Sequence, residues 1–329
     1  MSCRIRIHSW QSKLELDENI ERMKRLLLIG LGLLSGIAAQ AANFDIKIAD
    51  QFSKLVSNNA ELTKLAGGMK FLEGPVWVER DGGYLIFSDI PAEELKQWSA
   101  KNGLTTFRTN SHGINGNCVD RKGRLLSCEH LGRRVSITEK DGSVTALVDQ
   151  YEGKKFNSPN DVVVKSDGTV WFTDPDYGLG GKPKEVDGMN VYRFDPKSKT
   201  VSIVAKDCDH PNGLCFSPDE KRLYVADSGK PHLIRVYDVQ KDGTLGSGRV
   251  FCVIDKGVPD GIRCDAKGNI FSSAGDGVQI FNPQGELIGK ILVPESPANL
   301  CFGGKDKKTL FITARSSLYS IPVMVKGAK

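Results

Sequence analysis

One sequence pattern recurs six times along the chain and limits what the chain can fold into. Each copy begins with an acidic or amide residue, runs through a few apolar residues to a turn, and ends in a strongly apolar stretch. The turns contain pairs such as Asp81-Gly82 and Asp167-Gly168, which are typical of β-hairpins. Self-similar units of this kind indicate a repeat architecture. The six copies start at residues 73, 115, 160, 212, 260 and 299.

The spacing of the copies predicts the fold class. Successive starts lie 39 to 52 residues apart, which is room for four short strands and their turns. Repeated units of four antiparallel strands form the blades of a β-propeller, so we expect an all-β, six-bladed β-propeller with four strands per blade. An open sandwich or an eight-bladed ring does not account for six copies in register. With 35 Gly and 14 Pro among 329 residues, helices should be nearly absent.

The sixth copy lacks an outermost strand of its own. Only one further apolar run, at residues 317–323, follows it, whereas residues 61–65 precede the first copy as outer strands precede the other copies. We therefore expect an N-terminal strand to complete the last blade, because this closure removes an exposed sheet edge.

The N-terminal region indicates export. Lys24 and Arg25 precede an apolar run at residues 26–37, and Ala39-Gln40-Ala41 follows it, which is the order of a secretory signal peptide. The run is shorter than the roughly 20 residues that span a membrane. We expect a periplasmic protein whose translation starts at Met23. The expected organisation is an upstream extension at 1–22, a signal peptide at 23–41, a lead-in at 42–60 and the propeller at 61–325.

Charge and cysteine content exclude several classes of protein. Lys and Arg total 45 against 40 for Asp and Glu, a balance that gives no support for a nucleic-acid partner. Beyond the predicted signal peptide seven cysteines remain, an odd number without a Cys-x-x-Cys pair, so we expect neither a disulfide framework nor a zinc–thiolate site. Nothing resembles a membrane span or a dimerisation helix, and we expect a monomer.

The first residues of the six copies are candidates for a metal site. If the first strand of each blade lines the central channel, these side chains converge at one height around its axis. They offer only oxygen ligands, which calcium prefers, with magnesium or manganese as alternatives. Asn and Asp also begin turns for purely local reasons, but six copies in register favour a shared site. The set is Glu73, Asn115, Asn160, Asn212, Asp260 and Asn299.

Other catalytic motifs are scarce. The chain beyond the signal peptide has no G-x-S-x-G, no H-E-x-x-H and no phosphate-binding loop. His130 and His210 lie near repeat boundaries, where they would face the same channel mouth. We expect each of them to be a hydrogen-bonded loop residue rather than a catalytic base.

From about Glu73 to Tyr319 the chain resembles the gluconolactonase/regucalcin-like six-bladed propellers, and it is most similar to bacterial gluconolactonases. This resemblance covers most of the chain beyond the signal peptide. The segments that carry it are FLEGPVW, RLLSCEHLGRRV, FNSPNDVVVKSDGTVWFTDPDYG, HPNGLCFSPDEKRLYVAD, VPDGIRCDAKGNIFSSAGDGVQIF and PANLCFGGKDKKTLFITA.

The resemblance implies an enzyme that opens a sugar lactone with the help of a divalent cation, Ca²⁺ first and Mg²⁺, Mn²⁺ or Zn²⁺ as alternatives. It implies Asp260 as the catalytic acid that handles the attacking water. It also places Asn115, Asp174 and Tyr177 in substrate binding. The metal ligands that it implies are Glu73, Asn160, Asn212 and Asp260.

A cation at the channel mouth polarises an ester carbonyl and stabilises the charge that develops as water attacks. Within enzymes, the alternative is a hydrolase of other lactones or of phosphotriesters. From another class, the alternative is a binding propeller with a purely structural cation, which predicts apolar rather than polar blade ends. A quinoprotein-type redox enzyme would need further basic or aromatic residues around a large cofactor, and the sequence has no motif for one.

Overall fold

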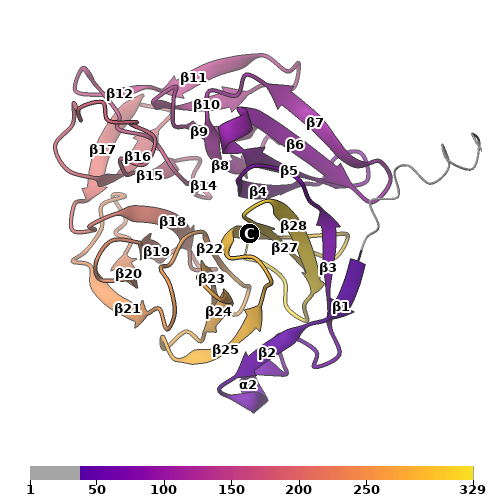
Figure 1. Cartoon of the computed structure of the whole chain (residues 1–329). Coiled ribbons are helices and arrows are strands. Elements are labelled where there is room, and N and C mark those ends of the chain that lie inside the picture. The colour runs from indigo at the N-terminus through magenta and orange to yellow at the C-terminus, as the bar shows by residue number, and fades with distance from the viewer. Residues whose placement is uncertain (1–37, 329) are drawn as a thin grey trace, which may run out of the picture. The chain divides into compact units, whose positions relative to one another are not determined.

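The computed structural model describes residues 38–328, and nearly all of their regular structure is β-strand. Six antiparallel sheets are arranged like blades around a central channel (Figure 1). Their innermost strands contact one another in cyclic order, the sixth meeting the first, which closes the ring. The predicted six-bladed propeller is therefore confirmed. Among the described residues, no helix is long and apolar enough to cross a membrane.

The first three blades each contain four strands in chain order from the channel outward. Blade one has β4 (Leu72–Val78), β5 (Tyr84–Asp89), β6 (Glu94–Ser99) and β7 (Gly103–Thr109). Blade two has β8 (Ile114–Val119), β9 (Leu125–Glu129), β10 (Arg134–Thr138) and β11 (Val144–Val148). Blade three has β14 (Val162–Val164), β15 (Val170–Asp174), β16 (Asn190–Asp195) and β17 (Thr200–Ala205).

The last three blades repeat this order, with N-terminal strands added to two of them. Blade four has β18 (Pro211–Phe216), β19 (Arg222–Asp227), β20 (Leu233–Asp238) and β21 (Arg249–Val253). Blade five has β22 (Ile262–Cys264), β23 (Ile270–Ala274), β24 (Gly277–Phe281), β25 (Leu287–Leu292) and β2 (Asn43–Ile46). Blade six has β26 (Pro297–Gly303), β27 (Thr309–Ala314), β28 (Ser317–Pro322), β3 (Glu61–Ala66) and β1 (Ala38–Ala41).

The N-terminal segment closes blade six, as predicted. Strand β3 pairs antiparallel with β28 and supplies the strand that the sixth repeat lacks. Two further pairings were not predicted: β2 adds a fifth strand to blade five, and β1 adds a fifth to blade six. The lead-in is therefore part of the propeller. The predicted signal peptide lies mostly outside the described residues, and its last four residues form β1.

The remaining elements are short. They are the helix α2 (Ala49–Phe52), the 3₁₀ turn η1 (Ile90–Ala92), and the small hairpin of β12 (Gln150–Tyr151) and β13 (Lys154–Lys155). The expectation of very few helices holds for the described part of the chain.

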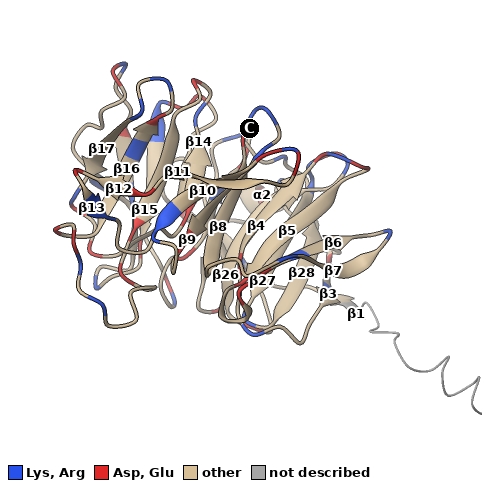
Figure 2. Ribbon diagram, turned by 90° about the horizontal axis from the view of Figure 1, so that it is seen from above, with Lys and Arg blue, Asp and Glu red and all other residues tan. Residues whose placement is uncertain are grey.

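The hairpin turns between the first two strands of the six blades share one backbone feature. Each of the six turns contains a residue with positive φ, which glycine adopts without strain. Four turns use glycine, whereas Glu220 and Lys307 adopt φ values of 56° and 59° in the other two. The sequence pairs that predicted hairpins therefore mark real turns. Most charged residues lie in the loops at the two ends of the strands (Figure 2).

The seven cysteines between Cys118 and Cys301 are all free thiols, and six of them are buried. They pack among valine, isoleucine and aromatic side chains in the clusters between neighbouring blades. In the described part of the chain these thiols therefore act as small apolar side chains of the core.

Candidate active site

The inner strands present equivalent residues at one end of the channel, and backbone hydrogen bonds fix which residues these are. The amide N–H of Gly116 donates to the carbonyl oxygen of Asn160 in the next blade at 2.8 Å, and Gly213 donates to Asp260 at 3.2 Å. Gly261 donates in the same way to Ala298 at 2.8 Å. The equivalent positions, here called the ring, are Glu73, Asn115, Asn160, Asn212, Asp260 and Ala298.

This register corrects one predicted position. The sixth ring residue is Ala298, and the predicted Asn299 lies one residue further along the strand. The same conclusion follows from hydroxyl groups: Ser88 donates to the carbonyl of Asn115 at 2.6 Å, and Ser273 donates to that of Ala298 at 2.6 Å. The prediction chose Asn299 because an asparagine begins three of the other copies. Which residue lies at the level of the ring is decided by hydrogen bonds between blades, and the sequence does not show these.

The position after each ring residue is glycine in four blades, because the next blade lies against it. A Cβ atom on Gly74 would lie 2.0 Å from the carbonyl oxygen of Asn115, and one on Gly213 would lie 2.4 Å from that of Asp260. The two exceptions are Asp161 and Asn299. Each accepts the N–H of the following residue on its own side chain, at 2.9 and 2.8 Å. Both side chains interact with charged groups of other blades near the ring.

Asn299 holds one oxygen of Glu73. Glu73 Oε2 accepts hydrogen bonds from the Gly74 N–H at 2.7 Å and from Asn299 Nδ2 at 2.9 Å. No described residue donates to Glu73 Oε1. Burial raises the pKa of Glu73 to about 7, although these two hydrogen bonds act in the opposite direction. The fixed carboxylate therefore has one oxygen free for a ligand in the channel.

Asp260 interacts with Glu73, Asn212 and Tyr177. Burial, followed by the charge of Glu73, raises the pKa of Asp260 well above its usual value, and a hydrogen bond with Asn212 lowers it. Burial also raises the pKa of the Tyr177 phenol to about 12; the charge of Asp260 acts in the same direction, and hydrogen bonds with Ser228 and Asn212 act against it. The structure therefore brings these predicted site residues together. Tyr177 is 48% exposed and lies at the mouth.

Asn160 and Asn115 face the site with different degrees of constraint. Asn160 is 4% exposed, and its side-chain amide makes no hydrogen bond with another described residue. Asn115 Nδ2 lies 3.2 Å from Nε2 of the buried His130, whose pKa burial lowers to about 4. An uncharged imidazole that accepts from Nδ2 leaves Asn115 Oδ1 facing away from His130. His130 is thus a hydrogen-bonded residue, as expected, but one that orients a ring side chain.

Asp174 does not line the pocket as the sequence predicted. Its carboxylate is fully buried and accepts the backbone N–H groups of Asn157 and Ser158, both at 2.8 Å. Burial raises the pKa of Asp174 to about 7, and these bonds lower it. Asp89 and Asp227 hold the corresponding loops of blades one and four in the same way. Asp174 therefore fixes the loop that leads into Asn160.

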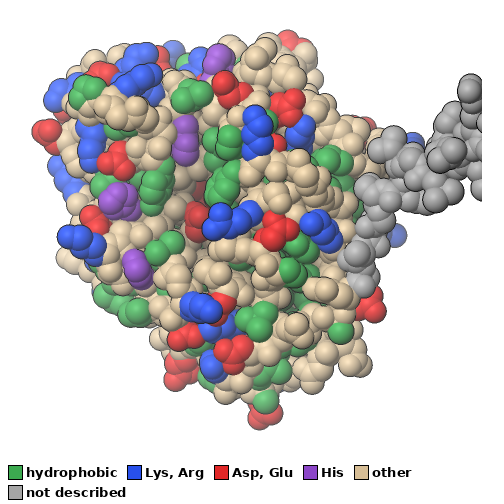
Figure 3. All heavy atoms as spheres, viewed as in Figure 1, with side chains coloured by type: hydrophobic (Ala, Val, Ile, Leu, Met, Phe, Trp, Pro, Cys, Tyr) green, Lys and Arg blue, Asp and Glu red, His purple; other side chains and the backbone are tan. Residues whose placement is uncertain are grey.

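The loops around the ring carry all four histidines of the described chain, and Figure 3 shows histidine side chains on this face. The ring of His210 lies 5.8 Å from that of Tyr177, and its Nε2 lies 3.7 Å from an Asp176 carboxylate oxygen. His210 Nδ1 is buried without a hydrogen-bond partner in the described structure. His210 therefore borders the mouth beside Tyr177.

An ion pair that the sequence did not reveal lies below the ring. Arg263 Nη1 donates to the buried Asp161 Oδ2 at 3.0 Å. Asp161 raises the pKa values of both Glu73 and Asp260, whereas Arg263 lowers that of Glu73. The sequence did contain one sign of this pair: position 161 is aspartate, whereas four of the equivalent positions are glycine.

The donor set fits a hard divalent cation. The described residues contain no group of three or more His, Cys, Asp and Glu side chains that would hold a metal ion. The ring instead combines two carboxylates, Glu73 and Asp260, with the amide oxygens of Asn160 and Asn212. Glu73 raises the pKa of Asp260, so a cation beside both carboxylates would stabilise their charged forms, and oxygen donors of this kind suit Ca²⁺ better than softer metals.

A six-bladed propeller with an oxygen-rich ring at one channel mouth defines a structural class, and comparison with known proteins places the chain within it. A family model described as the SMP-30/Gluconolactonase/LRE-like region matches residues 71–316, which include all six inner strands. The chain belongs to this family.

Individual relatives agree with this placement. The chain is 32% identical over 311 residues to a gluconolactonase from Zymomonas mobilis, covering 85% of this chain and 86% of that protein. A solved gluconolactonase from Xanthomonas campestris gives a TM-score of 0.82 at 33% identity, covering 88% of this chain and 99% of that one. Regucalcin from Agrobacterium tumefaciens, a calcium-binding protein, gives 0.66 at 22% identity over 80% and 95%, which shows a shared fold.

Proposed function

We propose that this protein is a lactonase that opens a sugar lactone of the gluconolactone type, and that it does so with a divalent cation, Ca²⁺ first, held by the ring. The gluconolactonases of similar sequence and structure support the enzyme class. The single observation that carries the cation is the pair of ring carboxylates, Glu73 and Asp260, whose charges interact and which no cationic residue of the ring neutralises.

Four side chains would hold the cation: Glu73 through Oε1, Asn160, Asn212 and Asp260. When bound, a divalent cation polarises the ester carbonyl and stabilises negative charge on its oxygen. The amides of Asn160 and Asn212 would coordinate the cation without adding negative charge, so the cation would remain a strong electrophile. Gly74 and Asn299 keep Glu73 Oε2 occupied, which orients Oε1 toward the channel.

Asp260 would accept a proton from the attacking water. Asp260 is one of only two carboxylates in the ring, and the other, Glu73, already accepts hydrogen bonds from Gly74 and Asn299. As the bond between the carbonyl carbon and the ring oxygen breaks, the ring oxygen takes up this proton and leaves as a hydroxyl, and the product is an open hydroxy acid. Asn115, which contacts His130, and Tyr177, which interacts with Asn212, would bind the hydroxyl groups of the substrate.

The experiment compares wild type with Asp260→Asn on glucono-δ-lactone, other lactones and a phosphotriester. Each enzyme is assayed after chelation and again with Ca²⁺, Mg²⁺, Mn²⁺ or Zn²⁺ restored. We expect wild-type hydrolysis of the sugar lactone to vanish on chelation and return with Ca²⁺. Asp260→Asn should keep the melting temperature while turnover falls by about 10² to 10⁴. Hydrolysis that ignores the chelator removes the cation from the mechanism, and hydrolysis of the phosphotriester alone changes the substrate class.

We also propose that the protein is exported to the periplasm and acts as a monomer. Cleavage after Ala41 would remove β1 from blade six and leave β3, β28, β27 and β26, the four-strand arrangement of the other blades. The N-terminal sequence of the protein purified from the periplasm would test the cleavage site, and Ala42 is the expected first residue.

A further inference from the structure

A cavity lies at the opposite end of the channel from the ring. It has a volume of about 540 Å³, and the far ends of all six inner strands line it, together with the turns that follow them and the C-terminal residues Gly327 and Ala328. Cavities of this size hold small organic molecules. The function proposed above makes no use of it.

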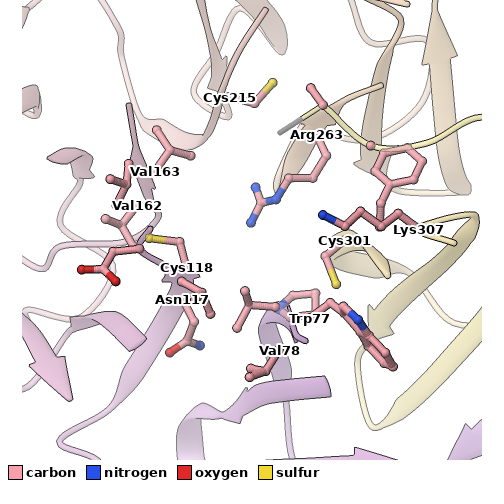
Figure 4. A pocket seen from close by; sticks show the side chains of 18 of the residues that line it. Trp77, Val78, Asn117, Cys118, Val162, Val163, Cys215, Arg263, Cys301 and Lys307 are labelled. Atoms are coloured by element: carbon pink, nitrogen blue, oxygen red, sulfur yellow. The ribbon is translucent and has the colours of Figure 1, made fainter. Parts of the chain in front are cut away.

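The wall of this cavity is mostly uncharged. Three residues beyond each ring position, the inner strands place two valines, three cysteines and one arginine along the wall. Burial raises the pKa of each of these thiols, so they are neutral. Trp77 and Phe302 add aromatic surface. The six residues at this level are Val76, Cys118, Val163, Cys215, Arg263 and Cys301, and Figure 4 shows the guanidinium of Arg263 reaching into the middle of the cavity.

Only one edge of that guanidinium is used by the protein. Arg263 Nη1 donates to Asp161 at 3.0 Å and to the carbonyl of Ile262 at 2.7 Å. Arg263 Nε and Nη2 donate to no described residue, and neither atom is sealed from solvent. The Nε–Nη2 edge has the geometry that binds a carboxylate through two parallel hydrogen bonds. A free donor pair therefore faces an otherwise apolar cavity.

The rim of the cavity favours an anion. Its three acidic residues are paired with cations: Glu79 with Lys307 at 2.7 Å, Asp120 with Arg124 at 2.8 Å, and Glu220 with Lys165 at 3.5 Å. Arg80 and Arg121 also line the rim, and neither forms an ion pair with a carboxylate of the described chain. Two uncompensated positive charges remain at the entrance, and such charges raise the local concentration of anions.

We propose that this cavity is a binding site for a small organic monocarboxylate with an apolar body. The carboxylate binds the Nε–Nη2 edge of Arg263, the apolar body lies against the valine, cysteine and Trp77 wall, and Arg80 and Arg121 attract the anion. This site is separate from the ring, so the proposal stands whether or not the ring holds a cation.

Calorimetric titration of the full chain with benzoate tests the proposal, with the neutral isostere benzamide as the matched ligand. We expect benzoate to bind one site with a Kd below about 1 mM and benzamide at least about tenfold more weakly, because only the carboxylate pairs with the guanidinium.

Two variants locate the binding site. Val163→Phe fills the cavity and leaves Arg263 in place. The double variant Asp161→Gly/Arg263→Met removes the ion pair as a unit, leaves no unpaired buried charge, and restores the glycine that four other blades have. Each should weaken benzoate binding at least about tenfold, whereas the exposed control Arg249→Met should not change it.

Melting curves establish whether each variant is folded. If the double variant does not fold, the binding measurement on Val163→Phe alone tests the proposal. No binding by wild type, equal binding of benzamide, or undiminished binding by folded Val163→Phe overturns the proposal. The last result would place the bound benzoate outside this cavity.

Discussion

At the scale of single residues, Asn299 orients the side chain of Glu73, which is one of the proposed metal ligands. It occupies a position where four blades have glycine, and it donates to the same Glu73 oxygen that receives the Gly74 N–H. The other oxygen of Glu73 is left free. A residue that fixes a metal ligand in this way typically affects metal affinity by 10- to 100-fold.

Replacing Asn299 by leucine should therefore weaken Ca²⁺ binding by about 10- to 100-fold, because Glu73 loses a donor that orients it. Calorimetric titration with Ca²⁺ measures the change, and Asn102→Leu in an exposed turn serves as control. Equal Ca²⁺ affinity in Asn299→Leu and wild type would show that Glu73 is oriented without this hydrogen bond.

His130 makes stability depend on pH. Its pKa is about 4 in the fold, whereas an unfolded histidine titrates near 6.5, so the unfolded chain binds a proton first as the pH falls. The free energy of unfolding attributable to His130 is therefore complete above pH 6.5 and declines toward pH 4. His130→Gln removes this titration and can still accept from Asn115.

Denaturant unfolding of wild type and His130→Gln at pH 8 and pH 4.5 measures this effect. From pH 8 to 4.5, wild type should lose about 2 to 3 kcal/mol more than the variant. Buried carboxylates with raised pKa values change the free energy of unfolding in the opposite direction as the pH falls. Because wild type and variant share these carboxylates, their contribution cancels when the two changes are subtracted. Parallel pH dependences in the two proteins would mean that His130 is protonated as readily in the fold as outside it.

At the scale of strands, the glycine after each ring residue sets how closely neighbouring blades approach. Gly213 has no unusual φ, yet a Cβ there would lie 2.4 Å from the carbonyl oxygen of Asp260 and 2.7 Å from the N–H nitrogen of Ile262. Both are backbone atoms and cannot move aside independently.

Gly213→Ala should therefore destabilise the fold by about 2 to 4 kcal/mol and displace Asp260. Gly246→Ala is the matched control, because the nearest atom to its Cβ would be a side-chain nitrogen of Gln240 at 3.5 Å. Thermal and denaturant unfolding compare the two, and equal stabilities would contradict the close packing described for β18 and β22.

The strands also show what sequence alone could establish. Inner strands and their turns were predicted because alternation and turn residues are local signals. The extra edge strands β1 and β2 were missed because edge pairing depends on a partner distant in sequence. The placement of Asn299 in the ring was wrong for the same reason: residue type matched, but register is set between blades. Asp174 was misassigned because nothing in TDPDYG shows that its carboxylate bonds to the Asn157 and Ser158 amides.

At the scale of the whole molecule, the ring of blades is closed by β3 pairing with β28. A chain that begins at Asn43 keeps this strand and should unfold in one cooperative transition with its lactonase activity retained. A chain that begins at residue 67 loses β3, exposes the edge of β28 and should lose that transition. Far-UV circular dichroism during heating compares the two, and cooperative melting of the shorter chain would show that closure does not depend on β3.

The account as a whole depends on a cation within the ring, and anomalous diffraction from crystals grown with Ca²⁺, then with Mn²⁺, tests this most directly. The account predicts one strong peak on the channel axis, with Glu73 Oε1, Asp260 and the amide oxygens of Asn160 and Asn212 about 2.3 to 2.6 Å from the Ca²⁺. A ring without such a peak, in crystals of protein that hydrolyses the lactone, would contradict it.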